Sequence, residues 1–281
     1  MILFKKSEEL SSFLLKKRQK GLKIGFAPTM GALHPGHISL IGNSKKGSDL
    51  TVSSIFVNPT QFNDPKDFEK YPVTLDTDLD ALEKAGCDAV LLPSVAEIYP
   101  NGMKNLPHYD LGYIETVLEG QYRPGHFQGV CQVVHRLLQI VDPHFLYLGQ
   151  KDYQQCMVIK KLIALTAMPT EVIICPTLRE ADGLAMSSRN LRLTETERKK
   201  AVRISEVLSF IKTQTRPGYL EDLKERAVQY LTAEGFTVDY VEIATAADLE
   251  IVQTWDGITP LVALVAAYLN GVRLIDNMVL Q

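Results

Sequence analysis

Short apolar runs alternate with helical patterns through residues 1–176 of the chain. The runs are aliphatic or β-branched and stop at Pro, Gly or Asn, as buried strands do. They cover residues 22–27, 50–57, 89–92, 145–148 and 172–175. Between them, helical spacing of apolar residues is found in 35–46, 75–85 and 127–141. Strands that alternate with helices predict an α/β fold, with a Rossmann-like parallel sheet and helices on both of its faces.

The pattern changes after Pro176, where an irregular polar segment begins. Two charged, amphipathic helices are predicted over 195–214 and 220–233, followed by strands over 237–243, 261–269 and 272–280. Asn270-Gly271 between the last two strands is typical of a two-residue hairpin turn. We therefore predict two domains, a Rossmann-like ligand-binding domain over residues 1–176 and a smaller C-terminal α+β lid domain over 177–281.

Composition narrows the choice of protein class. A length of 281 residues fits two domains, and a net charge of -3 supplies no general field for holding a polyanion. The four cysteines have the spacing of neither a CxxC pair nor a disulfide framework, which favours reduced thiols. The N-terminus has no signal-peptide core, and the longest strongly apolar stretch, 261–269, is too short to span a bilayer. We expect a soluble, cytoplasmic protein with neither a membrane nor a nucleic acid as partner.

Loops at the carboxyl ends of the predicted strands are the expected ligand site, because open parallel sheets bind ligands there. These loops are 28–37, 58–71 and 149–155. The chain contains neither the Walker sequence GxxxxGK[ST] nor the dinucleotide sequence GxGxxG. The first loop, PTMGALHPGH, offers another cradle, because Pro35 suits the first turn of a helix and that helix N-terminus attracts anions.

His34 and His37 are three residues apart, so their imidazoles lie on one side of a helical turn and can converge on a phosphate. A pair of capping or half-buried histidines is the structural alternative, and for an isolated HxxH it is the commoner one. Zinc is a second alternative, weakened because helical zinc pairs usually occur as HExxH with a catalytic glutamate inside.

Five motifs in order give the chain a family resemblance. The HxGH sequence after a first strand resembles the signature of the nucleotidylyltransferase-like superfamily. The wider set is similar to the motifs of the pantothenate synthetases, or pantoate-β-alanine ligases, and covers essentially the whole chain. The motifs are PTMGALHPGH at 28–37, FVNPTQF at 56–62, RPGHFQGV at 123–130, GQKDYQQ at 149–155 and DGLAMSSRN at 182–190.

The resemblance implies an ATP-dependent ligase with Mg²⁺ on the triphosphate. The carboxylate of (R)-pantoate would attack ATP to give pantoyl adenylate and pyrophosphate. The amine of β-alanine would then displace AMP, giving pantothenate. The family also implies a homodimer formed through the N-terminal domain.

The implied catalytic residues are His37, His34 and Lys151. The family assigns the second histidine, here His37, the role of proton donor. We expect hydrogen bonding to the transition state from both histidines, because a magnesium-bound pyrophosphate leaving group needs little protonation. The implied ATP-binding residues are Met30, Gly31, Ala32, Leu33, His34, Pro35, Gly36, His37, Gly149, Gln150, Lys151, Asp152, Leu178, Met186, Ser187, Ser188 and Arg189.

Amide side chains are the implied substrate contacts. Gln61 matches a position that binds both pantoate and β-alanine, and Gln155 one that binds pantoate; Asn58 and Arg123 are weaker candidates. For each alone, simple solvation is the alternative. Residues 64–71 are either a flap over the site or a solvated excursion. Val73 stands where the family pattern has an arginine, and the sequence identifies no metal ligand.

Three other functions remain open from the residues. A zinc hydrolase using His34 and His37 predicts stoichiometric bound zinc. A nucleotidylyltransferase of the same superfamily predicts a dinucleotide or CDP product rather than AMP. A nucleotide-sensing module predicts ATP binding without turnover. The charge disfavours an aminoacyl-tRNA synthetase, since no basic face or tail is evident for tRNA.

Overall fold

The computed structural model describes residues 1–62, 68–69 and 71–280, and these group into two compact units. Unit 1 comprises Met1–Gly149 and Val158–Pro176, and unit 2 comprises Gln150–Met157 and Thr177–Gln281. The grouping differs from the predicted division at residue 176 in one segment, Gln150–Met157, which belongs to unit 2. This segment groups with unit 2 because the strand β11, Val272–Val279, holds its backbone there.

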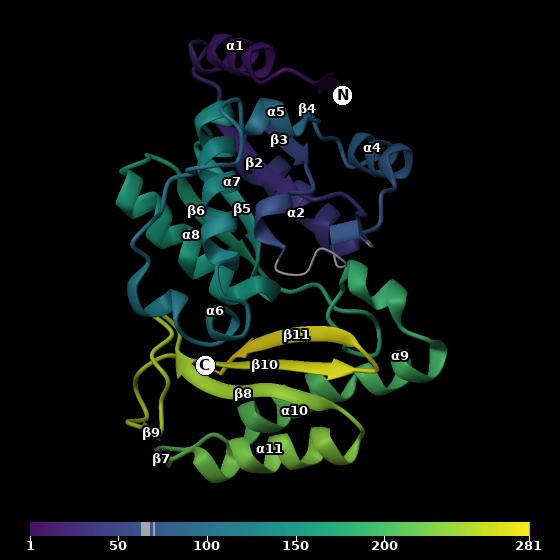
Figure 1. The fold of residues 1–281 in the computed structure, drawn as a ribbon, viewed down its shortest axis with the longest axis vertical. Coiled ribbons are helices and arrows are strands. Elements are labelled where there is room, and N and C mark those ends of the chain that lie inside the picture. Colours follow the sequence, from purple (N-terminus) through teal and green to yellow (C-terminus); the bar gives the residue numbers. More distant parts are fainter. Residues whose placement is uncertain (63–67, 70, 281) are drawn as a thin grey trace. The chain divides into compact units, whose positions relative to one another are not determined.

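Unit 1 is built on a six-stranded sheet in the order β1-β4-β3-β2-β5-β6, with every pair parallel (Figure 1). The strands are β1 (Ile2–Phe4), β2 (Ile24–Thr29), β3 (Leu50–Ile55), β4 (Ala89–Leu91), β5 (Phe145–Gly149) and β6 (Glu171–Cys175). The five predicted strands and their parallel arrangement are confirmed. The sixth, β1, was missed because three apolar residues followed by charges give no periodic signal.

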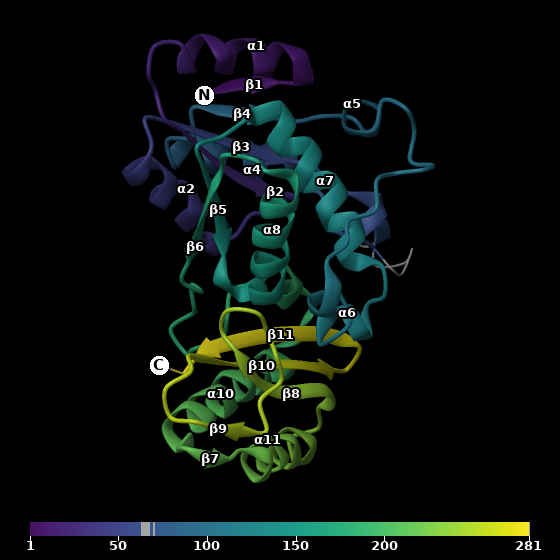
Figure 2. The ribbon, with the colours of Figure 1, turned by 90° about the vertical axis from the view of Figure 1, so that its left-hand side faces the viewer.

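Helices cover both faces of this sheet. Helix α2 packs on β2, β3 and β5 and touches α4, whereas α7 packs on β2 and touches α1 and α5 (Figure 2). The helices that begin in unit 1 are α1 (Ser7–Arg18), α2 (Pro35–Gly47), η1 (Pro59–Gln61), α4 (Leu75–Lys84), α5 (Val95–Ile98), η2 (Gly112–Glu115), α6 (Glu119–Tyr122) and α7 (His126–Val141). Helix α8 (Tyr153–Thr166) follows the short helix η3 (Gln150–Asp152) and leads into β6.

The strand order reverses between β2 and β5. From β2 the chain moves outward to β3, and from β5 it moves outward in the other direction to β6. Such a switch point leaves a crevice beyond the carboxyl ends of the two central strands, which is where open α/β sheets bind ligands. The loop between β2 and α2 therefore begins at the edge that the fold rule selects.

Unit 2 is an α+β unit around an antiparallel sheet in the order β11-β10-β8. Its elements are η4 (Ser188–Arg192), α9 (Glu195–Ala201), α10 (Arg203–Gln214), β7 (Gly218–Tyr219), α11 (Glu221–Ala233), β8 (Thr237–Thr245), β9 (Thr254–Trp255), β10 (Leu261–Leu269) and β11 (Val272–Val279). Asn270 and Gly271 both have positive φ, as the predicted hairpin turn requires. The single helix predicted over 195–214 is instead two helices, α9 and α10, which meet at Val202; this residue keeps helical angles, with φ −57° and ψ −27°, and its carbonyl accepts from the Glu206 N–H at 3.2 Å.

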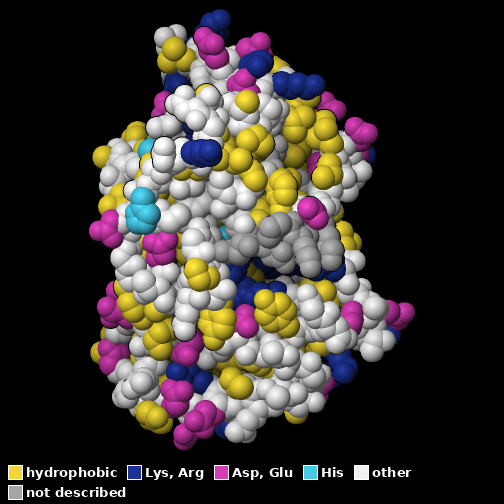
Figure 3. Space-filling view, viewed as in Figure 1, with side chains coloured by type: hydrophobic (Ala, Val, Ile, Leu, Met, Phe, Trp, Pro, Cys, Tyr) yellow, Lys and Arg dark blue, Asp and Glu magenta, His cyan; other side chains and the backbone are white. Residues whose placement is uncertain are grey.

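The surface carries both signs of charge. Acidic and basic side chains are interspersed over the face shown in Figure 3. Within the described part of the chain, no helix is long and apolar enough to cross a membrane. All four cysteines are buried, and burial raises the pKa of Cys87 and of Cys131 to about 12.

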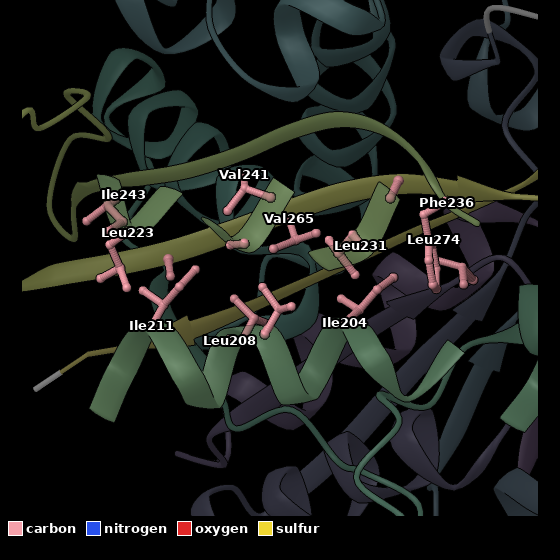
Figure 4. Packing of buried hydrophobic residues seen from close by; sticks show 14 of the residues in the cluster. Ile204, Leu208, Ile211, Leu223, Leu231, Phe236, Val241, Ile243, Val265 and Leu274 are labelled. Carbon is pink, nitrogen blue, oxygen red and sulfur yellow. The ribbon is translucent and has the colours of Figure 1, made fainter. Parts of the chain in front are cut away.

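The core of unit 2 lies between its sheet and the helices α10 and α11 (Figure 4). Leu208 on α10 is fully buried there, beside Leu231 of α11 and Val265 of β10. Ile258, in a loop of the same unit, is 83% exposed.

Truncation of this core residue should be costly. We expect Leu208→Ala to lower the free energy of unfolding by about 2–5 kcal/mol, because it removes buried methyl groups and leaves a cavity. Ile258→Ala is the matched control and should change it by less than about 0.5 kcal/mol. Urea denaturation followed by circular dichroism measures both, and equal losses would mean that the core has been misplaced.

Two adjacent serines in β3 give a sharper test in unit 1. Both are fully buried, but the Ser53 hydroxyl donates to the Ala27 carbonyl at 2.8 Å, whereas the Ser54 hydroxyl has no partner among the residues described. Ser53→Ala should cost about 1 kcal/mol, and Ser54→Ala should be neutral or stabilising, because only the first substitution breaks a hydrogen bond. Denaturation midpoints in the reverse order would contradict this description of β3.

Candidate active site

The two histidines of the HxGH motif cap the helix α2 through their Nδ1 atoms. His34 is the N-cap residue, and its Nδ1 accepts from the Gly36 backbone N–H at 3.1 Å. His37 Nδ1 accepts from the His34 backbone N–H at 3.3 Å. The rings lie 4.0 Å apart between centroids. The capping alternative for this pair is therefore realised, in the reciprocal form of a capping box.

Capping through Nδ1 also determines whether the Nε2 atom of each ring carries a proton. A neutral imidazole has one N–H donor and one acceptor, and the hydrogen bond at one nitrogen decides the state of the other. Because both Nδ1 atoms accept from backbone N–H groups, the proton of each neutral ring resides on Nε2. Capping and phosphate binding are thus compatible, since they use different nitrogens of the same side chain.

The loop of Met30 to Leu33 is held by a carboxylate from another helix. Asp78, on α4 and only 2% exposed, accepts from the backbone N–H groups of Ala32 at 2.9 Å and Leu33 at 2.8 Å. Ala32 has a φ of 49°, a left-handed conformation that costs a non-glycine residue roughly 1–2 kcal/mol. The bonds to Asp78 offset that strain. Sequence reasoning missed Asp78 because nothing local links it to a loop so far away in the chain.

Gln61 lies beside Met30 in unit 1. Its Nε2 donates to Met30 Sδ at 2.9 Å, and its backbone carbonyl accepts from His126 Nδ1 at 2.8 Å. The structure therefore brings together two of the predicted contact residues from loops after different strands.

Asn58 is a buried residue that caps the N-terminus of η1, and its side-chain amide binds several neighbouring groups. Nδ2 donates to the Gln61 side chain at 3.2 Å and to the Gly129 carbonyl at 3.1 Å, while Oδ1 accepts from Tyr99 at 2.7 Å and from Thr60. A Cβ on Gly129 would come within 2.3 Å of the Thr60 carbonyl oxygen, so glycine permits this close packing. We interpret Asn58 as a residue that positions Gln61.

The structure places Arg123 in an ion pair and Val73 in solvent. Arg123 Nη1 lies 3.5 Å from Oε2 of Glu119, one helical turn earlier, and the Glu119 side chain is mostly buried. Val73 is 82% exposed, so this apolar side chain takes the place of the expected arginine in a solvated position. Of the predicted flap over 64–71, residues 64–67 and 70 lie outside the described residues.

In unit 2, one pocket is lined by Lys151 and by residues of the SSRN segment, which spans 187–190. The pocket includes Lys151, Ser187, Arg189, Arg273 and Asp276. Arg273 is engaged by Asp239 at 2.7 Å, and Lys151 Nζ lies 3.6 Å from the half-exposed carboxylate of Asp152. The lining carries three cationic side chains and one buried carboxylate, and because Arg273 is already paired with Asp239, Lys151 and Arg189 are the cations we consider for an anion.

The remaining predicted residues of unit 2 lie close to this pocket in the chain. Leu178 is partly exposed, and its carbonyl accepts from the Met186 N–H at 3.0 Å in a tight hairpin. Ser187 Oγ accepts from the Arg189 N–H at 3.2 Å and so begins η4, which contains Ser188. Gln155 is half-buried in the first turn of α8.

Two buried residues of β11 were missed by sequence reasoning. Asp276 pairs with Arg179 through Nη1 at 2.6 Å and Nη2 at 3.0 Å. Burial raises the pKa of the Asp276 carboxyl, and the bonds from Arg179 oppose that rise. Asn277 Nδ2 donates to the carbonyls of Gln150 at 2.9 Å and Lys151 at 2.8 Å. In the sequence both appear within an ordinary strand, with no signal of a role.

The grouping of possible metal ligands tests the zinc alternative. Over residues 1–62, 68–69 and 71–280, no three His, Cys, Asp or Glu side chains are grouped so that they could hold a metal ion. Structural and catalytic zinc sites require at least three such ligands, so the described residues do not form the zinc site of the hydrolase alternative. They also form no all-protein cage for magnesium.

Comparison with known proteins identifies relatives over the full chain. The family model described as pantoate-beta-alanine ligase matches residues 2–279. Pantothenate synthetase from Cytophaga hutchinsonii is 43% identical over 285 residues, covering 100% of this chain and 99% of the relative. That from Acetivibrio thermocellus is 44% identical over 276 residues, covering 97% of each chain.

Solved structures agree with these relatives. Pantothenate synthetase from Thermus thermophilus superposes with a TM-score of 0.91 at 36% identity, covering 100% of this chain and 99% of that one. The pantoate-beta-alanine ligase from Francisella tularensis, complexed with beta-gamma ATP and beta-alanine, has a TM-score of 0.80 at 39% identity, covering 100% and 98%. The chain therefore belongs to the pantoate-β-alanine ligase family.

Proposed function

We propose that the protein condenses (R)-pantoate with β-alanine to give pantothenate, AMP and pyrophosphate, by way of a pantoyl-adenylate intermediate. The observation that carries the proposal is the family match over residues 2–279, which includes all five motifs. Magnesium enters as the counter-ion of ATP. This agrees with the absence of a cage of metal-binding side chains in the described residues, since Mg²⁺ commonly binds through substrate phosphates and water.

In the first step, a carboxylate oxygen of pantoate bonds to the α-phosphorus of ATP as the bond to the β-phosphate oxygen breaks. Pyrophosphate leaves with the bonding electrons, so negative charge grows on its oxygens. The Nε2–H groups of His34 and His37 and the ammonium of Lys151 are the donors we assign to that charge. Positioned donors stabilise such a transition state electrostatically, without covalent participation.

In the second step, the amine of β-alanine attacks the acyl carbon, AMP leaves and the amine loses its proton. Gln61 orients both substrates and Gln155 binds pantoate, because an amide can donate to a carboxylate and accept from a hydroxyl. Arg123 is retained as a weaker candidate. Asn58 contributes through the position of Gln61.

The ATP contacts follow from the motif positions. Lys151 and Arg189 would meet phosphate charge, Ser187 and Ser188 would donate hydroxyls, and Asp152 would hold the ribose. The remaining contacts are through backbone groups or close packing, and we assign them to Met30, Gly31, Ala32, Leu33, Pro35, Gly36, Gly149, Gln150, Leu178 and Met186. We further propose that the protein is cytoplasmic and forms a homodimer. Sedimentation velocity tests the dimer.

Substrate omission tests the overall reaction. We expect AMP and pyrophosphate from MgATP in amounts equal to pantothenate only when pantoate and β-alanine are both present, and a bound adenylate when β-alanine is left out. Chromatography of the nucleotides with a coupled pyrophosphate assay measures this. A dinucleotide or CDP product would point to the nucleotidylyltransferase alternative, and binding of ATP without turnover to the sensor alternative.

Two substitutions distinguish the roles of the two ring nitrogens of His37. In His37→Asn, the side-chain oxygen can keep the cap at the Nδ1 position, but the donor at the Nε2 position is lost. His37→Gln keeps a donor near that position and loses the cap. We expect kcat/KM for AMP formation to fall roughly 10²–10³-fold in His37→Asn and less in His37→Gln, because the donor stabilises the transition state. A larger loss in His37→Gln, parallel to its Tm, would assign His37 to capping alone.

Gln155→Ala tests the placement of pantoate. Removing the amide should raise KM for pantoate by tenfold or more while KM for ATP changes little, because a hydrogen bond to a charged substrate contributes roughly 1.5–3 kcal/mol. Steady-state kinetics with each substrate varied in turn measures the two constants. The opposite pattern would mean that Gln155 faces the nucleotide.

A further inference from the structure

Two adjacent residues of β11 connect the two loops that line the pocket of unit 2. Asp276 and Asn277 are 5% and 2% exposed, and neither belongs to a motif of the family resemblance. Strand β11 touches both η3, which carries Lys151, and η4, which begins after Ser187.

Asn277 holds the η3 turn by its backbone. Both N–H bonds of its amide are used, one on the Gln150 carbonyl at 2.9 Å and one on the Lys151 carbonyl at 2.8 Å. Its Oδ1 accepts from the Gln150 side chain at 3.3 Å. The Lys151 Cα is thereby attached to a rigid strand, and only the flexible part of its side chain remains adjustable.

Asp276 holds the hairpin that precedes the SSRN segment. Arg179 forms a forked pair with its carboxylate and donates from the same guanidinium to the Gly183 carbonyl at 3.1 Å and the Asn277 carbonyl at 3.3 Å. The Asp276 carboxylate also accepts from the Asn277 backbone N–H at 2.8 Å. Arg179 faces Ala185 across the hairpin, so the pair fixes both of its arms.

We propose that Asp276 and Asn277 form a clamp of positioning residues that sets Lys151 in register with Ser187 and Arg189. The inference rests on the proposed function, in which these three side chains meet the phosphates of ATP. Neighbouring residues of a strand are separated by about 3.3 Å, so the clamp leaves little freedom between the two loops. A misplacement of about 1 Å can cost a catalytic group as much as 100-fold in rate.

Asn277→Leu tests the clamp, because leucine has nearly the shape of asparagine but neither the amide donor nor the amide acceptor. We expect kcat for AMP formation to fall roughly 100-fold, with KM for ATP changing much less, because a misplaced donor is lost mainly in the transition state. Asn277→Ala is the second variant. It leaves room for water on the two carbonyls and should show the same pattern in a less perturbed core.

A double-mutant cycle with Lys151→Ala distinguishes positioning from general destabilisation. If Asn277 acts through Lys151, Asn277→Leu should reduce the residual rate of Lys151→Ala by less than about threefold. Equal fold-losses in the two backgrounds would overturn the proposal.

Val272→Ala is the matched structural control, because Val272 is a buried core residue of the same strand with no bond to either loop among those described. It should lower Tm and leave kcat within about twofold. A similar fall in kcat for Val272→Ala and Asn277→Leu would show that loss of β11 packing, rather than of the clamp, explains the effect.

Backbone hydrogen exchange measures how firmly the clamp holds residues 150–155, and it does so independently of activity. In Asn277→Leu, exchange should rise in residues 150–155 and remain near the wild-type rate in the distant helix α11. Unchanged exchange in 150–155 would refute the clamp. Failure of wild-type protein to make AMP would refute the proposed function instead, so the two failures are distinguishable.

Discussion

The backbone N–H groups in the first turn of α2 are the constraint on which the proposed chemistry depends. A helix start leaves donors that need acceptors, and here the acceptors are the Nδ1 atoms of His34 and His37. An aspartate or serine could cap the helix equally well, but neither would present an N–H on its far side. Histidine satisfies the helix and keeps a donor, so one side chain serves both folding and phosphate chemistry.

The same principle recurs at three other places, where a buried polar side chain holds the backbone of a loop. Asp78 binds the loop before α2, Asn58 binds the Thr60 N–H of η1 and the Gly129 carbonyl of α7, and Asn277 binds η3. Each anchor is distant in sequence from at least one of the groups it binds, and each is nearly inaccessible to solvent. Loops lack the regular hydrogen bonds of helices and strands, so such anchors supply the rigidity that oriented catalysis requires.

Apolar periodicity was sufficient to predict the framework, because burial of one face dictates it. The strands β2 to β6, the helices α2, α4 and α7 and the Asn270-Gly271 turn all follow from local patterns. The motifs identified the family, and the structure places Gln61 beside Met30, and Lys151 in one pocket with Ser187 and Arg189. Asp78, Asp276 and Asn277 could not be found this way, because their partners are set by tertiary contacts. The same limit applies to segment Gln150–Met157, which is grouped with unit 2 and binds it through tertiary contacts with β11 and with the Ala246 carbonyl.

The tautomer of the two histidines is the most direct test of this account. Long-range ¹H–¹⁵N correlation spectra of protein labelled at histidine, recorded at a pH where the rings are neutral, distinguish a protonated Nε2 from a protonated Nδ1. The account predicts the Nε2–H form for both His34 and His37, with unprotonated Nδ1 atoms. Protonated Nδ1 in either ring would contradict the cap and, with it, the donors assigned to the leaving pyrophosphate.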